Sequence, residues 1–123
     1  MIEDIIKKLI KTENRISEEK GSFNFFGLFK RTDLEDTWDL IISAFWFSTN
    51  KQADLIYIIK EIRKDLNIED LSFLTRVVLI KPEDKFIKKL NMAINIQHGM
   101  TEMINTQIDG IRLRHAYIIT SKK

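Results

Sequence analysis

The sequence predicts a single α+β domain: a mixed, mainly antiparallel sheet of about five strands covered by three main helices, in the order α-β-β-α-β-α-β-β. Stretches with apolar residues at helical spacing alternate along the chain with short aromatic and β-branched stretches. The length of 123 residues is typical of one domain, and no Pro, Gly or Ser-rich linker divides residues 1–123. Such a succession leads to a sheet with helices packed on it.

Residues 2–20 have the pattern of an amphipathic helix. Apolar residues including Ile5, Leu9 and Ile16 recur at helical spacing, with lysines on the other side. Gly21 is a natural end for this helix. Acidic residues offset the lysines, so the pattern favours a helix packed on or near the sheet over one that lies on a membrane.

Two neighbouring strands are expected at 22–31 and 37–46, separated by a polar turn at 32–36. Both stretches are rich in residues that suit a pleated surface, and a short polar turn between two such runs indicates an antiparallel pair. Alternation in the second stretch leaves both of its faces largely apolar, which is typical of a central strand.

A second long helix is predicted from about 50 to 66. Thr49 followed by Gln52 has the form of a capping box at its start. Asn67 is expected to end this helix in a left-handed conformation. Residues 69–74 are expected to add a short helical turn.

The remaining elements follow from short local signals. The continuously apolar run at 76–80 is typical of a strand buried on both faces. Pro82 is predicted as the first residue of a helix that runs to about 92. Two strands are expected near 100–107 and 111–120, joined at Asp109-Gly110, because a primed two-residue turn needs positive φ at both positions. A longer loop from Asn105 to Gly110 is the alternative.

Composition and charge exclude several classes of protein. There is no cysteine, so disulfides and thiolate chemistry are excluded, and the formal net charge is only +2. The amino-terminal stretch mixes acids and bases, unlike a signal peptide, and no run reaches the roughly 20 apolar residues of a membrane span. We therefore expect a cytoplasmic protein without a membrane association.

Catalytic and ligand motifs are not found in the sequence. His98 and His115 are the only histidines, without metal-site spacing, and the four isolated glycines form no phosphate loop. We expect no metal and no cofactor. His98 is expected to be an exposed loop residue and His115 a hydrogen-bonded structural residue of the last strand.

Aromatic residues are concentrated in one part of the chain, because eight of the twelve lie between positions 23 and 47. A domain of this size has limited interior volume for so many rings, so the excess predicts contact with another protein. The leading hypothesis is a non-enzymatic interaction domain that self-associates, as a homodimer, through its aromatic strands; a different protein partner is also compatible. The residues predicted for this contact are Phe23, Phe25, Phe29, Trp38, Trp46 and Phe47.

Basic residues suggest a second hypothesis, nucleic-acid binding. From Asp109 to the end of the chain there are four basic side chains and one acidic one. If these residues converge with the lysines of the 81–89 region, they can bind phosphates; scattered, solvated lysines are the alternative. The residues concerned are Lys81, Lys85, Lys88, Lys89, Arg112, Arg114 and His115.

A third hypothesis is a hydrolase or nuclease that uses Asp39 and His115. A metal-dependent nuclease needs an acid on one strand and another acid two residues before a lysine on the next strand. The run at 76–81 contains no acid. The hypothesis therefore requires that Asp39 and His115 reach a common substrate atom.

Three strand-like strings are similar to those of a known family. They are FGLF at 26–29, WDLIISA at 38–44 and HAYIITS at 115–121. The chain resembles a family of small uncharacterised bacterial proteins of about 120 to 130 residues over most of its length. Many relatives carry Pro where this chain has Phe45. The resemblance implies a single domain and contributes no activity.

Overall fold

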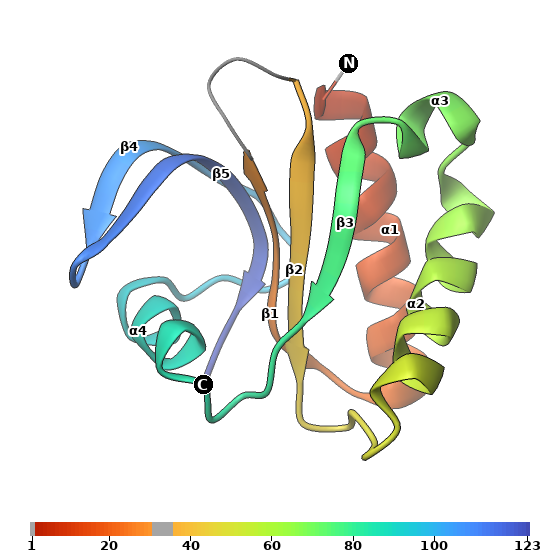
Figure 1. Cartoon of the computed structure of the whole chain (residues 1–123), viewed down its shortest axis with the longest axis horizontal. Coiled ribbons are helices and arrows are strands. Elements are labelled where there is room, and N and C mark those ends of the chain that lie inside the picture. Colours follow the sequence, from red (N-terminus) through yellow and green to blue (C-terminus); the bar gives the residue numbers. More distant parts are fainter. Residues whose placement is uncertain (1, 31–35) are drawn as a thin grey trace.

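The computed structural model describes residues 2–30 and 36–123, which form an open five-stranded sheet flanked by helices (Figure 1). The helices are α1 (Ile2–Lys20), α2 (Lys51–Asp65), α3 (Ile68–Leu71) and α4 (Lys85–Ala93). The strands are β1 (Phe23–Lys30), β2 (Trp38–Ala44), β3 (Leu74–Leu79), β4 (Thr101–Ile108) and β5 (Ile111–Ser121). The predicted α+β class and order of elements are confirmed. The turn predicted at 32–36 lies, except for its last residue, outside the described residues.

β1 is at the centre of the sheet, whose strand order is β3-β2-β1-β5-β4. It pairs antiparallel with β2 and with β5, and β5 pairs antiparallel with β4. β2 and β3 are parallel, because the connection through α2 and α3 returns the chain to the end where β2 began. The predicted antiparallel pairing of the first two strands is confirmed.

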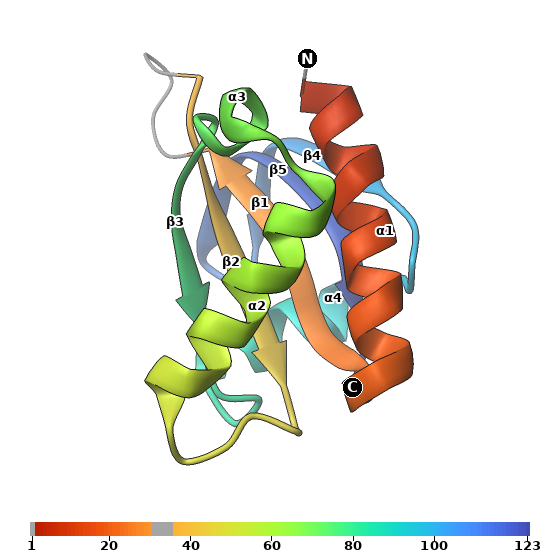
Figure 2. The same cartoon turned by 90° about the vertical axis from the view of Figure 1, so that its right-hand side faces the viewer.

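Helices cover both faces of the sheet (Figure 2). α1 and α2 lie side by side on one face and α4 lies on the other, each over its own apolar cluster. Trp38, Leu40 and Ile42 of β2 belong to the cluster beneath α1 and α2, whereas Ile41 belongs to the cluster beside α4. β2 therefore contributes to both cores, as its alternating pattern predicted.

β3 is an edge strand, and the prediction that it is buried on both faces is wrong. Leu79 is its single buried residue, and Thr75 and Arg76 are exposed. Val77 packs on the α1 and α2 side and Val78 on the α4 side, which explains the continuous apolar run. Because β3 contacts both helical layers, its sequence has the same apolar pattern as a central strand. The apolar run therefore did not reveal that β3 is at the edge of the sheet.

α2 (Lys51–Asp65) agrees with the predicted helix from about 50 to 66, but both predicted capping assignments are wrong. Asn50, and not the Thr49–Gln52 pair, caps α2, and its side chain accepts a hydrogen bond from the backbone N–H three residues further on (3.1 Å). Asn67 begins α3 with φ −84° and exchanges two hydrogen bonds with Asp70. A short polar side chain serves at either end of a helix, so the sequence alone did not separate the two roles.

Pro82 lies in the turn before α4 and is not its first residue. Asp84 N donates to Lys81 O (3.0 Å), and the Asp84 carboxylate accepts a hydrogen bond from Phe86 N (2.9 Å). Asp84 is therefore the N-cap of α4. The end of α4 at Ala93 agrees with the predicted end near 92.

The predicted Asp109-Gly110 hairpin turn is confirmed. Both residues have positive φ, 46° and 84°, and Ile108 pairs with Ile111 directly across the turn. This tight turn fixes the register of the β4–β5 hairpin.

The β4–β5 hairpin changes face along its length. Asn105 has a φ of 47°, which interrupts the regular strand conformation of β4. Leu113 of β5 packs in the cluster beside α4, whereas Tyr117 and Ile119 pack beneath α1 and α2. Leu113 and Tyr117, four residues apart in β5, therefore pack against different helical layers.

Within the described ranges, no helix combines the length and the apolar character needed to cross a membrane.

Candidate functional site

A groove of about 990 Å³ lies where the parallel strands β2 and β3 end. After β2 the chain continues to α2 on one face of the sheet, and after β3 it continues to α4 on the other face (Figure 1). Chains that leave neighbouring parallel strands toward opposite faces open a crevice beyond the strand ends, which is a common place for a binding site in such sheets. The fold therefore produces a concave surface at this end.

Phe45 is the main exposed ring at this groove. β2 ends at Ala44, two residues before the predicted end at 46, and Phe45 follows in a turn with 72% of its surface exposed. Trp46 is fixed against the protein, because its Nε1 donates to Gly21 O (3.0 Å) and its ring contacts that of Phe47 at a centroid distance of 4.9 Å. Phe45 therefore projects from a rigid base.

A second, smaller hollow of about 450 Å³ lies on the other side of Phe45. Its charged lining consists of Lys20, Lys122 and Lys123, and Trp46 forms part of its wall. We call this the lysine hollow. Figure 2 shows the end of α1 and the C-terminus on one side of the end of β2, and the segment after β3 on the other side. The groove, Phe45 and the lysine hollow together are called the end face below.

The groove has charges of both signs. Lys51 and Lys81 line it together with Asp54, Glu83 and Asp84. The Asp54 carboxylate accepts a hydrogen bond from Ser48 N (2.8 Å) and Asp84 caps α4. Glu83 forms no ion pair with any residue that the structure describes, so its carboxylate faces solvent.

Three of the six residues predicted to contact another protein are unavailable for that role. Phe23, Phe25 and Trp38 are at most 1% exposed, because β1 and β2 lie inside the sheet between the two helical layers. Phe29 is half-buried in contact with the Phe86 ring (5.8 Å). Of the predicted residues, Trp46 and Phe47 lie half-buried at the end face, and the buried Phe23 forms part of the wall of the lysine hollow.

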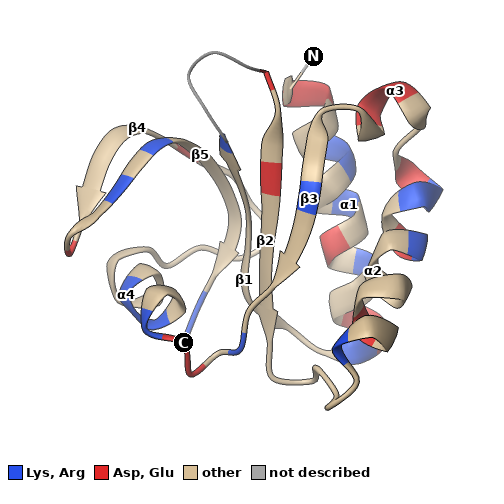
Figure 3. Ribbon diagram, viewed as in Figure 1, with Lys and Arg blue, Asp and Glu red and all other residues tan. Residues whose placement is uncertain are grey.

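The predicted basic residues come from three segments, the turn after β3, α4 and β5 (Figure 3). Lys81 lines the groove, Lys85 and Lys88 are exposed at α4, and Lys89 Nζ lies 3.9 Å from the Asp109 carboxylate. Arg112 and Arg114 of β5 are exposed. Leu113 between these arginines packs toward α4, so strand alternation directs the two arginines away from the α4 lysines.

His115 faces a carboxylate and an indole. Its Nε2 lies 2.7 Å from Glu102 Oε2, and its ring contacts that of Trp38 at 5.1 Å. Hydrogen bonds from His115 and then Tyr117 lower the pKa of Glu102. Burial, followed by the hydrogen bond to Glu102, raises the pKa of Tyr117 to about 12. The hydrogen-bonded arrangement expected for His115 is present.

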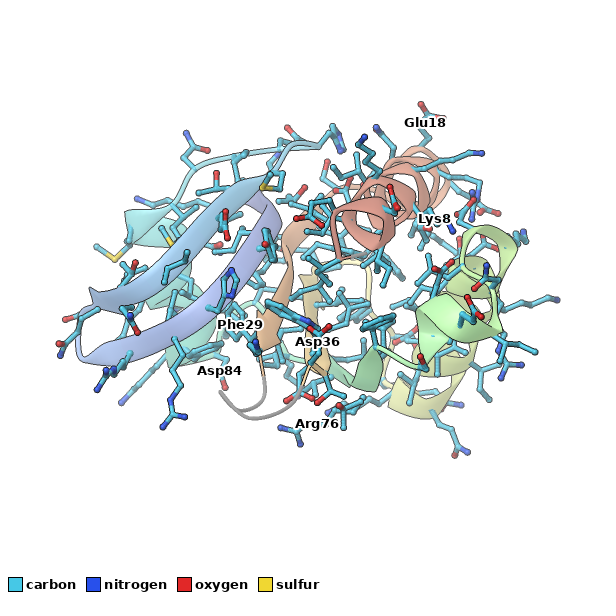
Figure 4. All side chains as sticks on the ribbon, turned by 90° about the horizontal axis from the view of Figure 1, so that it is seen from above. Lys8, Glu18, Phe29, Asp36, Arg76 and Asp84 are labelled. Atoms are coloured by element: carbon cyan, nitrogen blue, oxygen red, sulfur yellow. The ribbon has the colours of Figure 1, made fainter. Side chains whose placement is uncertain are left out.

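Asp39 and His115 lie on opposite faces of the sheet. Asp39 of β2 pairs with Phe29 of β1, which packs in the cluster beside α4. The Asp39 carboxylate forms an ion pair with Arg76 (3.1 Å). His115 contacts Trp38 on the other face. The structure therefore does not bring the two side chains to a common substrate atom. Phe29 and Arg76, the neighbours of Asp39, are labelled in Figure 4.

A buried polar cluster links α1 to the C-terminal strand and was missed by the sequence analysis. Glu13 is fully buried, with Oε1 2.6 Å from His98 Nδ1 and Oε2 accepting a hydrogen bond from Thr120 Oγ1 (2.7 Å). His98 N donates to Thr120 Oγ1 (3.1 Å), and His98 has a φ of 54°. His98 lies in a loop as expected, but it is half-buried and not exposed, because its ring is held by Glu13. Glu13 on a lysine-rich helix gave no local signal of this contact.

Residues 2–30 and 36–123 contain no cluster of three or more His, Cys, Asp or Glu side chains placed to hold a metal ion.

Comparisons with protein-family models, with curated proteins and with solved structures find no match to this chain. The resemblance to a family of small bacterial proteins therefore stays a prediction.

Proposed function

We propose that this chain is a non-enzymatic, cytoplasmic protein-interaction domain that pairs with a second copy of itself through the end face. The aromatic residues that suggested self-association are largely buried, so the proposal uses the rings at the end face. Phe45 replaces the buried Phe23, Phe25 and Trp38 as the principal contact.

The exposure of Phe45 is the observation that carries this proposal. A Phe ring that is 72% exposed leaves on the order of 100 Å² or more of apolar surface in water. At about 25 cal/mol per Å², covering that surface contributes roughly 3 kcal/mol. A twofold interface contains the ring twice, so one residue contributes about 6 kcal/mol of gross association free energy.

A second copy is the occupant that the end face fits best. Each protomer presents a projecting ring beside a groove whose lining includes apolar Phe47, Ile80 and Pro82. In a twofold dimer the ring of each protomer enters the groove of the other, so one surface supplies both the projection and the recess. Charges of both signs on the same surface are also compatible with a self-complementary contact.

The proposal is tested by sedimentation velocity and light scattering over a concentration series from about 1 to 500 μM. We expect a concentration-dependent dimer for the unchanged protein. Phe45→Ala should weaken the dimer by 10³-fold or more, since each tenfold change corresponds to about 1.4 kcal/mol. Ile68→Ala is the matched control, because Ile68 is 87% exposed on α3 and lines neither the groove nor the lysine hollow.

Two results would contradict the proposal. A protein that stays monomeric throughout the series has no self-association to explain. A dimer that Phe45→Ala and Ile68→Ala affect equally uses a different surface.

A further inference from the structure

The two hollows that flank Phe45 differ in charge. All the charged residues that line the lysine hollow are Lys20, Lys122 and Lys123, whereas the groove has two lysines and three acids. Phe45 belongs to the lining of both hollows, so it stands between them. The end face is therefore basic on one side of the ring and mixed, with an acidic excess, on the other.

The charged residues of the end face differ in whether they already have a partner within the described chain. Within the described chain, Glu83, Lys122 and Lys123 form no ion pair, and Lys20 Nζ lies over the Tyr57 ring at 5.0 Å. Asp54 is already bonded to Ser48. Glu83 is thus the acid of the groove that is free to meet a basic partner.

Building on the proposed self-association, we infer that the dimer axis passes beside Phe45 and that the lysine hollow of each protomer receives the turn before α4 of the other protomer. Glu83 is the contact residue of that turn. In a twofold interface, a residue that contacts a second residue on the other protomer is itself contacted in the reverse sense. When one side of the axis is basic and the other is acidic, opposite charges face each other only if the basic side of each protomer meets the acidic side of the other. Phe45, near the axis, then enters the groove of the second copy.

These charge contacts determine orientation more than strength. Ion pairs at the rim of an interface contribute little affinity, but like charges placed opposite each other oppose the wrong arrangement. They are also screened by salt, because the Debye length is about 8 Å at physiological ionic strength. The dimer is therefore expected to weaken several-fold between low salt and about 1 M salt, while the aromatic contact persists.

Complementary charge reversals test this arrangement. One variant carries Lys122→Glu and Lys123→Glu, and the other carries Glu83→Lys with Asp84 unchanged, because Asp84 caps α4. Each variant alone should self-associate at least tenfold more weakly than the unchanged protein, because like charges then face each other. An equimolar mixture should form a heterodimer within about threefold of the original affinity, since one contact has both charges exchanged and the other is unaltered.

The readout is sedimentation velocity with one variant fluorescently labelled, and thermal unfolding followed by circular dichroism confirms that each variant is folded. Lys60→Glu is the control for the change of charge, because Lys60 is exposed on α2 and lines neither hollow. It should leave the dimer within about twofold of the unchanged protein.

Failure of this inference is distinct from failure of the proposed function. If Phe45→Ala abolishes the dimer while both charge variants dimerise normally, the end face is the interface and the crossed charge contact is refuted. If each charge variant is weakened but the mixture is not restored, the charges do not face each other and the inference is also refuted. A strictly monomeric unchanged protein overturns both.

Discussion

Replacing Glu13 with alanine removes a carboxylate that is fully buried and holds two other elements in place. The substitution leaves the Thr120 hydroxyl, also fully buried, without its acceptor, and His98 without the group that orients its ring. An unsatisfied buried hydroxyl costs about 1 to 3 kcal/mol, and the missing side-chain volume adds about 1 to 2 kcal/mol. We expect Glu13→Ala to lower the free energy of unfolding by about 2 to 5 kcal/mol.

The assay is urea unfolding at pH 7, followed by the fluorescence of Trp38 and Trp46. Glu13→Gln keeps the volume and one oxygen acceptor, so it should lose only about 1 to 2 kcal/mol. Glu18→Ala is the matched control on the same helix, because Glu18 is exposed and points away from the protein (Figure 4). Such surface changes usually stay within about 0.5 kcal/mol.

A double-mutant cycle isolates the contact with His98. Glu13→Gln and His98→Ala, made singly and together, should show a coupling free energy of about 1 kcal/mol or more, because the two side chains are in direct contact. If Glu13→Ala costs no more than Glu18→Ala, or if the coupling is near zero, the buried cluster does not stabilise the fold as described.

Three other predictions address stability and binding. Burial raises the pKa of Asp65, but hydrogen bonds from Arg15 and then Thr12 outweigh this effect, so the pKa is lowered. The resulting stabilisation is present above about pH 4 and is lost as the pH falls through the lowered folded-state pKa. Arg15→Gln should therefore flatten the loss of stability below about pH 4, measured by urea unfolding at a series of pH values. Gly27→Ala should cost about 1 to 3 kcal/mol in the same assay, because the added methyl group would lie 3.2 Å from a β5 carbonyl oxygen, and an unchanged stability would show that β1 has room there. If β5 binds nucleic acid, Arg112→Ala with Arg114→Ala should weaken binding and reduce the salt slope by about two, measured by fluorescence anisotropy, whereas an unchanged affinity would exclude this surface.

Local patterns were sufficient to predict the order of the elements. The helical spacing of residues 2–20 and the primed turn at Asp109-Gly110 depend on neighbours a few positions apart, and both are as expected. The edge position of β3 depends on which strand is next to it in space, so it was not accessible from residues 76–80. Helix caps failed for a related reason, because Asn67 suits either end of a helix.

The candidate site was predictable only in part. The aromatic-rich stretch that the sequence singled out contains Phe45, but the sequence did not distinguish buried Phe25 from exposed Phe45, because that depends on where β2 ends. The contact between Glu13 and His98 joins positions 85 residues apart. Neither residue has a local pattern that indicates the other.

The position of β5 has a consequence for biosynthesis. β5 leaves the ribosome after the other four strands, yet it lies inside the sheet between β1 and β4. Until β5 emerges, one side of β1 has unpaired backbone amides and carbonyls next to its apolar rings, and the pairing that covers them joins positions far apart in the sequence. The sheet should therefore be completed only once β5 has left the ribosome, and β1 is the segment that a chaperone would need to protect from aggregation before then.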